Sequence, residues 1–195
     1  MKYIFEIIWI CWLLSEIFLN RLLRSKTTNS NELDKNSLNL IWVAIIASMT
    51  LGIISASYWT APMVNTNVLL YFGSALIVVG MIIRFIAIRT LGKFFTVNLA
   101  LHGDHTLIKA GLYKYIRHPS YSGSLLSFLG FGLSLNNWLS LMIIIVPILI
   151  TFINRINIEE KLLENQFGTE YSDYKKKTER LIPFLYWDNI RMYTT

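Results

Sequence analysis

Five apolar stretches constrain the fold of this chain more than any other feature. A helix that crosses the hydrocarbon core of a bilayer needs about 20 predominantly apolar residues. Only 15% of the 195 residues are charged, against about 25% in soluble domains. We therefore predict an all-α integral membrane protein with five transmembrane helices. The stretches are residues 3–23, 39–60, 67–90, 119–136 and 138–157, of which the fourth is at the lower limit for a span.

The basic residues are unevenly distributed, although the net charge of +6 alone would also suit a nucleic-acid-binding protein. Except for Lys2, they lie in loop 21–38, in region 84–118 and from Arg155 onward, while loop 61–66 and turn 136–137 have none. With five spans, all the basic clusters fall on one side of the membrane. Because basic loops remain in the cytoplasm, we predict an N-terminus outside and a cytoplasmic C-terminus. These charges would also attract anionic membrane lipid, and we predict no nucleic-acid partner.

The sequence offers little for metal or dinucleotide chemistry. Cys11 is the only cysteine, and His102, His105 and His118 do not have the spacing of metal ligands. No GxGxxG motif occurs, so the sequence predicts no Rossmann domain. We accordingly expect no bound metal.

Two apolar stretches contain polar features with open interpretations. Glu6 and Glu16 lie in the first stretch, where an ionised acid at the bilayer centre costs roughly 2.5–3.5 kcal/mol. A structural helix contact and a part in substrate entry are both possible. The fourth stretch carries small residues at helical spacing, which favour close packing against another helix or leave room for a bound lipid tail. This small-residue stripe comprises Ser120, Ser124, Ser127, Gly130 and Ser134.

The last apolar stretch should continue beyond the membrane. Between Trp138 and Phe167 only one proline interrupts the helical pattern, so the helix could run about 30 residues, or roughly 45 Å. The hydrocarbon core is about 30 Å thick. The turns from about Arg155 should therefore project into the cytoplasm before Gly168 ends the helix. Arg155 and Glu159 are four residues apart and share one face.

The polar segments flanking the last two stretches resemble the isoprenylcysteine carboxyl methyltransferase family. The resemblance rests on HTLIKAGLYKYIRHPSYSG from His105, RxxxEE from Arg155, FGxEYxxY from Phe167 and a late proline. It implies an integral-membrane enzyme that uses S-adenosylmethionine, forms S-adenosylhomocysteine and has its cofactor pocket in the cytoplasmic C-terminal segments. We expect one membrane domain, residues 1–195, with three N-terminal spans in 1–90, the catalytic motifs in 91–185 and a tail in 186–195.

The resemblance also assigns roles to individual residues. It places Arg155 at the substrate carboxylate and makes Arg117 important without a defined role, and we group both as catalytic. Asn98 is a looser match than the other cofactor residues. The cofactor contacts that the family implies are Asn98, His105, Thr106, Leu107, Ile108, Tyr113, His118, Pro119, Ser120, Tyr121 and Glu159.

The chemistry of these side chains suits methyl transfer to a carboxylate. Glu159 can pair with the cationic end of the cofactor, and the planar guanidinium of Arg155 can hold a carboxylate by two hydrogen bonds. A carboxylate is already ionised at pH 7, so the reaction needs no general base. The resemblance, with which this chemistry agrees, implies methylation of a lipophilic acceptor, such as a prenylated cysteine, that enters from the bilayer.

Other functions remain open from sequence alone. The acceptor could be another small lipid or a polyketide-like molecule, and the chain could instead be a sterol-reductase-like enzyme using NADPH or a non-enzymatic membrane scaffold. A composition rich in Lys, Asn and Ile indicates a bacterial inner membrane. The physiological acceptor, the oligomeric state and the role of Glu160 are not defined by the sequence.

Overall fold

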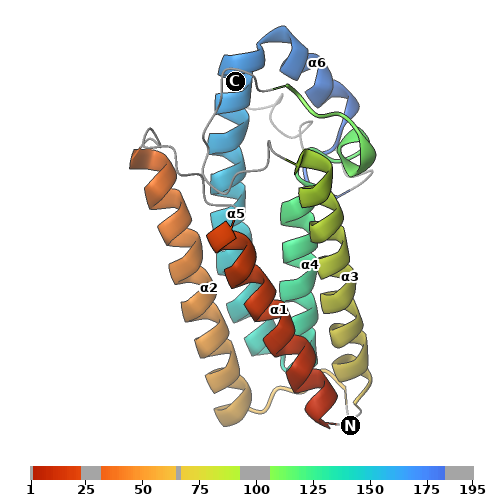
Figure 1. Ribbon diagram of the computed structural model, residues 1–195. Helices are drawn as coiled ribbons and strands as arrows, with labels where there is room; N and C mark the ends of the chain where they lie inside the picture. The colour runs from red at the N-terminus through yellow and green to blue at the C-terminus, as the bar shows by residue number, and fades with distance from the viewer. Residues whose placement is uncertain (1, 23–31, 65–66, 93–105, 183–195) are drawn as a thin grey trace.

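The computed structural model describes residues 2–22, 32–64, 67–92 and 106–182, and in these ranges it is helical with no β-strand. Each of the five apolar stretches forms a helix, and a sixth, short helix follows (Figure 1). The helices are α1 (Lys2–Leu22), α2 (Glu32–Tyr58), α3 (Val68–Leu91), α4 (Pro119–Ser134), α5 (Trp138–Phe167) and α6 (Thr169–Lys177), with a 3-10 helix, η2 (Gly111–Lys114), before α4.

Local sequence determines where the last helices begin and end. Pro119 occupies the first turn of α4, where its missing N–H removes no intrahelical hydrogen bond. The side chain of Asn137 caps α5 by accepting a hydrogen bond from the Ser140 amide at 3.0 Å. Gly168, with a φ of +53°, ends α5 after Phe167, as predicted. The thirty residues of α5 therefore form one continuous helix.

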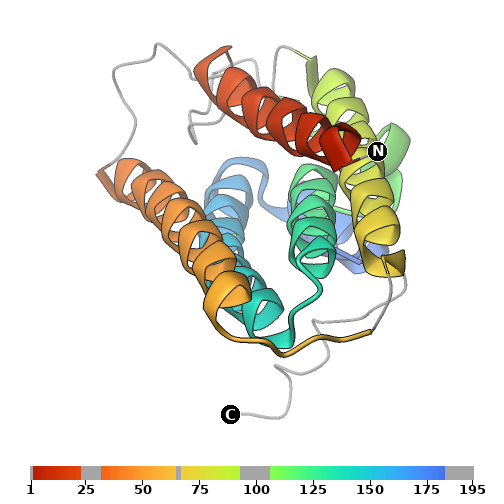
Figure 2. The same cartoon turned by 90° about the horizontal axis from the view of Figure 1, so that it is seen from below.

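The long helices pack in two groups. In one group α3 runs beside α4 and α1 lies on α3, while in the other α2 lies against α5 (Figures 1 and 2). The groups meet where α4 contacts α5. Buried side chains from all five helices form the common core: Trp12, Ile41, Met49, Ile77, Phe128, Phe131, Ile144, Ile148 and Phe152.

The small-residue stripe of α4 forms the contact with α3. A Cβ atom added at Gly80 would lie 2.3 Å from the Ser127 hydroxyl oxygen, and one at Gly130 would lie 2.4 Å from the Gly73 carbonyl oxygen. Ser127 donates a hydrogen bond to the Ile77 carbonyl at 3.2 Å. This face of α4 therefore leaves no space for a lipid tail. The alternative interpretation of the stripe as the lining of an opening is wrong, because the backbones of α3 and α4 fill that space.

Glu16 makes the structural contact that the sequence left open. Its carboxylate pairs with the Arg84 guanidinium on α3 at 3.0 Å, and both side chains are mostly buried. Arg84 also donates to the Ser120 hydroxyl at 3.0 Å. The pair thus ties α1 and α3 to the first turn of α4, and the charge of Glu16 is compensated inside the bundle.

Three helices are long and apolar enough to cross a membrane within the described ranges. These are residues Asn36–Tyr58 of α2, together with the whole of α3 and α5. Large apolar side chains on these helices are exposed on the outside of the bundle, among them Val43, Phe85 and Ile150. With α4 only 16 residues long, the number of spans expected from sequence stays a prediction.

Candidate active site

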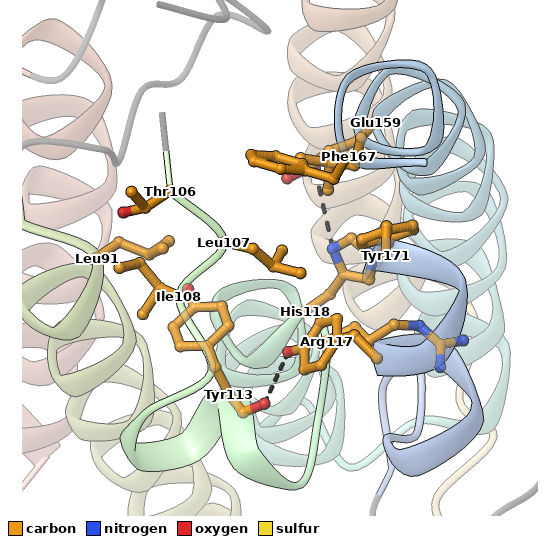
Figure 3. Close-up of a pocket in the computed structure, with 12 residues that line it drawn as sticks. Leu91, Thr106, Leu107, Ile108, Tyr113, Arg117, His118, Glu159, Phe167 and Tyr171 are labelled. Atoms are coloured by element: carbon orange, nitrogen blue, oxygen red, sulfur yellow. Dashed lines mark hydrogen bonds and ion pairs between the residues drawn. The ribbon is translucent and has the colours of Figure 1, made fainter. Parts of the chain in front are cut away.

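A cleft lies at one end of the bundle (Figure 3). At this end α5 extends past α4 and meets α6 (Figure 1). The lining comes from the end of α3, the segment before α4, the last turns of α5 and helix α6. Most of these side chains are aliphatic or aromatic, and the charged ones gather on one side. The lining residues are Leu91, Thr106, Leu107, Ile108, Tyr113, Arg117, His118, Glu159, Leu163, Phe167, Tyr171 and Tyr174.

The two adjacent acids of α5 have different environments. The Glu159 side chain is 29% exposed and faces the cleft, with an oxygen 3.9 Å from Nδ1 of the buried His118 (Figure 3). The Glu160 side chain is 4% exposed and lies in a network of basic groups. Neighbouring positions on a helix are separated by about 100°. Glu159 is therefore the acid that can meet a ligand, and Glu160 is an internal one.

Glu160 is the centre of a buried ion-pair network. One carboxylate oxygen accepts hydrogen bonds from Arg117 Nε at 3.0 Å and from His118 Nε2 at 3.1 Å. The other accepts from Arg180 Nη2 at 2.6 Å. A buried carboxylate is compatible with a stable fold only when its negative charge is paired and its oxygens accept hydrogen bonds. The network fixes the His118 ring with Nδ1 toward Glu159.

Arg117 joins the start of α4 to the segment after α6. Its guanidinium also donates to the carbonyl of Lys175 at 3.0 Å and to the carbonyl of Thr178. Its backbone amide donates to the Glu179 carbonyl at 2.7 Å, and Ile116 pairs with Glu179 in an isolated parallel bridge. These contacts give Arg117 a structural explanation, and its expected catalytic role stays a prediction.

Arg155 lies deeper in the bundle, outside the lining of the cleft. Its side chain is 1% exposed, and its guanidinium donates to the hydroxyl of Ser37 at the start of α2. The Tyr121 phenol lies between the two site residues of α5, since it interacts with both Arg155 and Glu159. Tyr121 thus connects the cleft with the interior position of Arg155.

The phenols that line the cleft remain protonated at neutral pH. Burial raises the pKa of Tyr113, and the negative charge of Glu159 raises it further. Burial also raises the pKa of Tyr174, whose hydroxyl donates to the Tyr113 carbonyl at 2.7 Å. These groups can donate hydrogen bonds but cannot act as bases near pH 7.

The cleft brings together several of the residues predicted from sequence. Pro119, Ser120 and Tyr121 occupy the first turn of α4 and do not line it, while Asn98 and His105 lie outside the described residues. Within the described ranges, no group of three or more His, Cys, Asp or Glu side chains could hold a metal ion. Predicted residues that do line the cleft are Thr106, Leu107, Ile108, Tyr113, Arg117, His118 and Glu159.

Sequence reasoning did not assign Leu91, Leu163, Phe167, Tyr171 or Tyr174 to the site. The last three belong to the FGxEYxxY pattern, which was a usable signal because it follows the paired acids directly. The two leucines gave no signal, since an apolar residue near the end of a helix resembles any other core residue.

The fold and the site define a helical membrane protein with a ligand cleft at one end of its bundle, and comparisons with known proteins identify its family. Residues 68–170 match the family model described as phospholipid methyltransferase (PEMT). This range is more than half of the chain, and the chain belongs to that family.

Curated proteins that this chain resembles include protein-S-isoprenylcysteine O-methyltransferases. The Saccharomyces cerevisiae protein-S-isoprenylcysteine O-methyltransferase is 39% identical over 62% of this chain and 51% of its own length. A probable protein-S-isoprenylcysteine O-methyltransferase of Oryza sativa subsp. indica is 36% identical over 59% of this chain and 61% of its own. The chain therefore spans about half to three-fifths of these relatives. They are eukaryotic and give no support to the expected bacterial membrane.

A solved structure is also similar. The eukaryotic intramembrane Ras methyltransferase ICMT (isoprenylcysteine carboxyl methyltransferase) superposes with a TM-score of 0.62 and 30% sequence identity, covering 73% of this chain and 52% of that one. The similarity extends the family resemblance from sequence to three-dimensional structure. It agrees with an integral membrane protein and with the resemblance drawn from the motifs.

Proposed function

We propose that this protein transfers a methyl group from S-adenosylmethionine to the carboxylate of a lipophilic acceptor, such as a prenylated cysteine. The observation that carries the proposal is the cleft itself, in which the half-buried Glu159 carboxylate faces flat and aliphatic walls at the end of a membrane bundle. The relatives whose names include isoprenylcysteine O-methyltransferase support the same reaction class.

The residues of the cleft fit the proposed cofactor chemically. Leu107, Ile108 and Tyr113 provide apolar and aromatic surface for a flat ring, and Glu159 provides a negative charge for a cationic group. S-Adenosylmethionine bound there would supply an electrophilic methyl group on a positively charged sulfur. Arg117 and His118 are held by Glu160, so this wall of the site is ordered before a ligand binds.

Arg155 is proposed to hold the acceptor. It lies one helical turn before Glu159 on α5, and a guanidinium can bind a carboxylate in a defined orientation. An ionised carboxylate needs alignment and exclusion of water rather than a base. The buried position of Arg155 excludes water, and the protonated phenols near the cleft are consistent with a reaction that needs no base.

The acceptor is proposed to enter between α1 and α2. The α3–α4 contact is closed, whereas α1 packs mainly on α3 and α2 mainly on α5 (Figure 2). Leu13 from α1 and Ile45 from α2 are only partly buried against the common core. A prenyl or acyl tail that stays in lipid keeps about 0.8 kcal/mol per buried CH₂. A path between these helices would lead the acceptor toward Ser37 and Arg155.

Orientation in the membrane is the remaining part of the proposal. We place the cleft, α6 and the C-terminal segment in the cytoplasm and the N-terminus outside, because the basic residues gather at the cleft end. The water-soluble cofactor would then reach the site from the cytoplasm. Anionic lipid at the same surface would face Lys176 and Lys177 of α6.

Isotope transfer tests the reaction directly. The purified protein should move label from S-adenosylmethionine to a farnesylated N-acetylcysteine and not to its methyl ester, in which the carboxylate is blocked. Arg155→Lys should lose most of this activity while S-adenosylhomocysteine still binds, since a point charge does not copy a planar guanidinium. Normal turnover by the lysine variant would contradict the proposed bidentate contact. Oxidation of NADPH in place of methyl transfer would indicate a reductase.

A further inference from the structure

Tyr171 borders the cleft, and among the described residues that line it, its hydroxyl is a buried side-chain polar group without an explanation. The side chain is 1% exposed, and the hydroxyl has no hydrogen-bond partner among the residues that the structure describes. A buried hydroxyl without a partner costs about 1–3 kcal/mol. Phenylalanine would fill the same space without that cost, so the hydroxyl requires an explanation.

Tyr174, three residues further along α6, provides the contrast. Its ring centre lies 6.0 Å from that of Tyr171, and it also borders the cleft. Its hydroxyl, however, donates to the Tyr113 carbonyl at 2.7 Å. Two neighbouring tyrosines on one short helix therefore differ in whether the described part of the protein satisfies the hydroxyl. The role of Tyr174 is structural, and that of Tyr171 has to be sought in the cleft.

The charges around Tyr171 restrict what its hydroxyl can bind. Burial raises the pKa of the phenol, and the carboxylates of Glu160 and Glu159 raise it further, so the group is a hydrogen-bond donor at neutral pH. The same carboxylates disfavour an anion beside the hydroxyl. An uncharged acceptor atom, such as a ribose hydroxyl oxygen or a nitrogen of a heteroaromatic ring, matches these conditions.

We propose that Tyr171 is a ligand-binding residue whose hydroxyl donates a hydrogen bond to an uncharged acceptor in the nucleoside part of the cofactor. This inference rests on the proposed function, because it takes the cleft to be the S-adenosylmethionine site. Phe167, only partly buried, also lines the cleft (Figure 3). Because Tyr171 is 1% exposed, a side chain that borders it must shift for the ligand to reach the hydroxyl.

Two matched substitutions test this assignment. Tyr171→Phe and Tyr174→Phe each remove one oxygen atom from neighbouring buried rings. S-Adenosylhomocysteine binding is measured by calorimetry in detergent, and the melting temperature is measured without ligand. Tyr171→Phe should weaken binding about twofold to tenfold, the range for one neutral hydrogen bond, and leave the ligand-free melting temperature equal or higher. Tyr174→Phe should lower that temperature by about 2–4 °C, because it leaves the Tyr113 carbonyl without its donor.

The outcomes separate this inference from the proposed function. Wild-type protein that binds S-adenosylhomocysteine, with unchanged affinity in Tyr171→Phe, overturns the role of Tyr171 and leaves the proposed function intact. A ligand-free loss of stability in Tyr171→Phe as large as that in Tyr174→Phe also overturns it, because the hydroxyl then has a partner in the protein. Wild-type protein that does not bind S-adenosylhomocysteine overturns both.

Discussion

Glu159 and Glu160 are adjacent on α5, yet their side chains lie in different environments. One carboxylate is 29% exposed at the cleft, and the next is 4% exposed among four basic side chains. The sequence pairs them as identical neighbours, yet only Glu159 can meet a ligand. Substitution of Glu159 should therefore weaken ligand binding, whereas substitution of Glu160 should destabilise the fold.

Replacing Glu159 should weaken cofactor binding without unfolding the protein. Glu159→Gln removes the negative charge but keeps the shape, and we expect S-adenosylhomocysteine affinity to fall by about 2–4 kcal/mol if the acid pairs with a cationic group. Calorimetry in detergent measures this. Glu164→Gln, on the same helix with a partly buried salt bridge to Lys175, should leave the affinity unchanged. Equal affinities for wild type and Glu159→Gln would show that Glu159 does not contact the cofactor.

Arg117 should act mainly through stability. Arg117→Met leaves Glu160 without one of its buried partners and frees the Thr178 carbonyl, and breaking a buried ion pair costs about 3–5 kcal/mol. The melting temperature in detergent should therefore fall strongly in Arg117→Met. The control Arg89→Met, at an exposed position, should leave the melting temperature unchanged. A stable Arg117→Met protein that binds S-adenosylhomocysteine normally but cannot transfer methyl groups would show instead that Arg117 is catalytic.

Among the elements, the contact between α3 and α4 depends on the absence of side chains. A Cβ at Gly80 would lie 2.3 Å from the Ser127 oxygen and 2.4 Å from the Gly123 carbonyl oxygen. Gly80→Ala should consequently destabilise the protein by about 1–3 kcal/mol through overpacking. Val79→Ala, on the exposed side of the same helix, is the matched control. A melting temperature unaffected by Gly80→Ala would mean that the two helices do not approach so closely.

The positions of the helices could be predicted from the sequence, but which helices pack against one another could not. Apolar length identified all five long helices, because hydropathy and helix length are local properties. The stripe containing Ser127 and Gly130 allowed two interpretations, since small residues serve both helix packing and open space. Only the three-dimensional arrangement shows that Gly73 and Gly80 of α3 fill that space.

The site was predictable only in part, for a related reason. Motif residues such as His118 and Glu159 were identified because polar groups at the end of an apolar helix are costly and stand out. Arg180 could not be assigned, because its contact with Glu160 joins segments twenty residues apart across α6. Leu91 and Leu163 line the cleft but carry no chemical signature.

For the whole molecule, the orientation in the membrane follows from charge. Lys114 and Lys176 should be labelled from the cytoplasm, and Asn136 from outside, when each is replaced by cysteine. The background needs Cys11→Ala, because Cys11 is exposed on the bundle surface. A membrane-impermeant thiol reagent applied to sealed vesicles distinguishes the sides. Labelling of positions 114 and 136 from the same side would contradict the proposed orientation.

At the end of the bundle opposite the cleft, side-chain hydrogen bonds connect two loops. Asn136, with a φ of +49°, accepts a hydrogen bond from the Met63 amide at 3.1 Å and donates to the Val64 carbonyl at 2.7 Å. The Asn137 side chain donates to the Trp59 carbonyl at 2.5 Å. The loop after α2 is thus bound to the turn between α4 and α5. Because Glu160 holds the other end of α5 to Arg117 and His118 at the start of α4, α5 is clamped against α4 at both ends. The Ser37–Arg155 hydrogen bond likewise gives α2 a second attachment to α5.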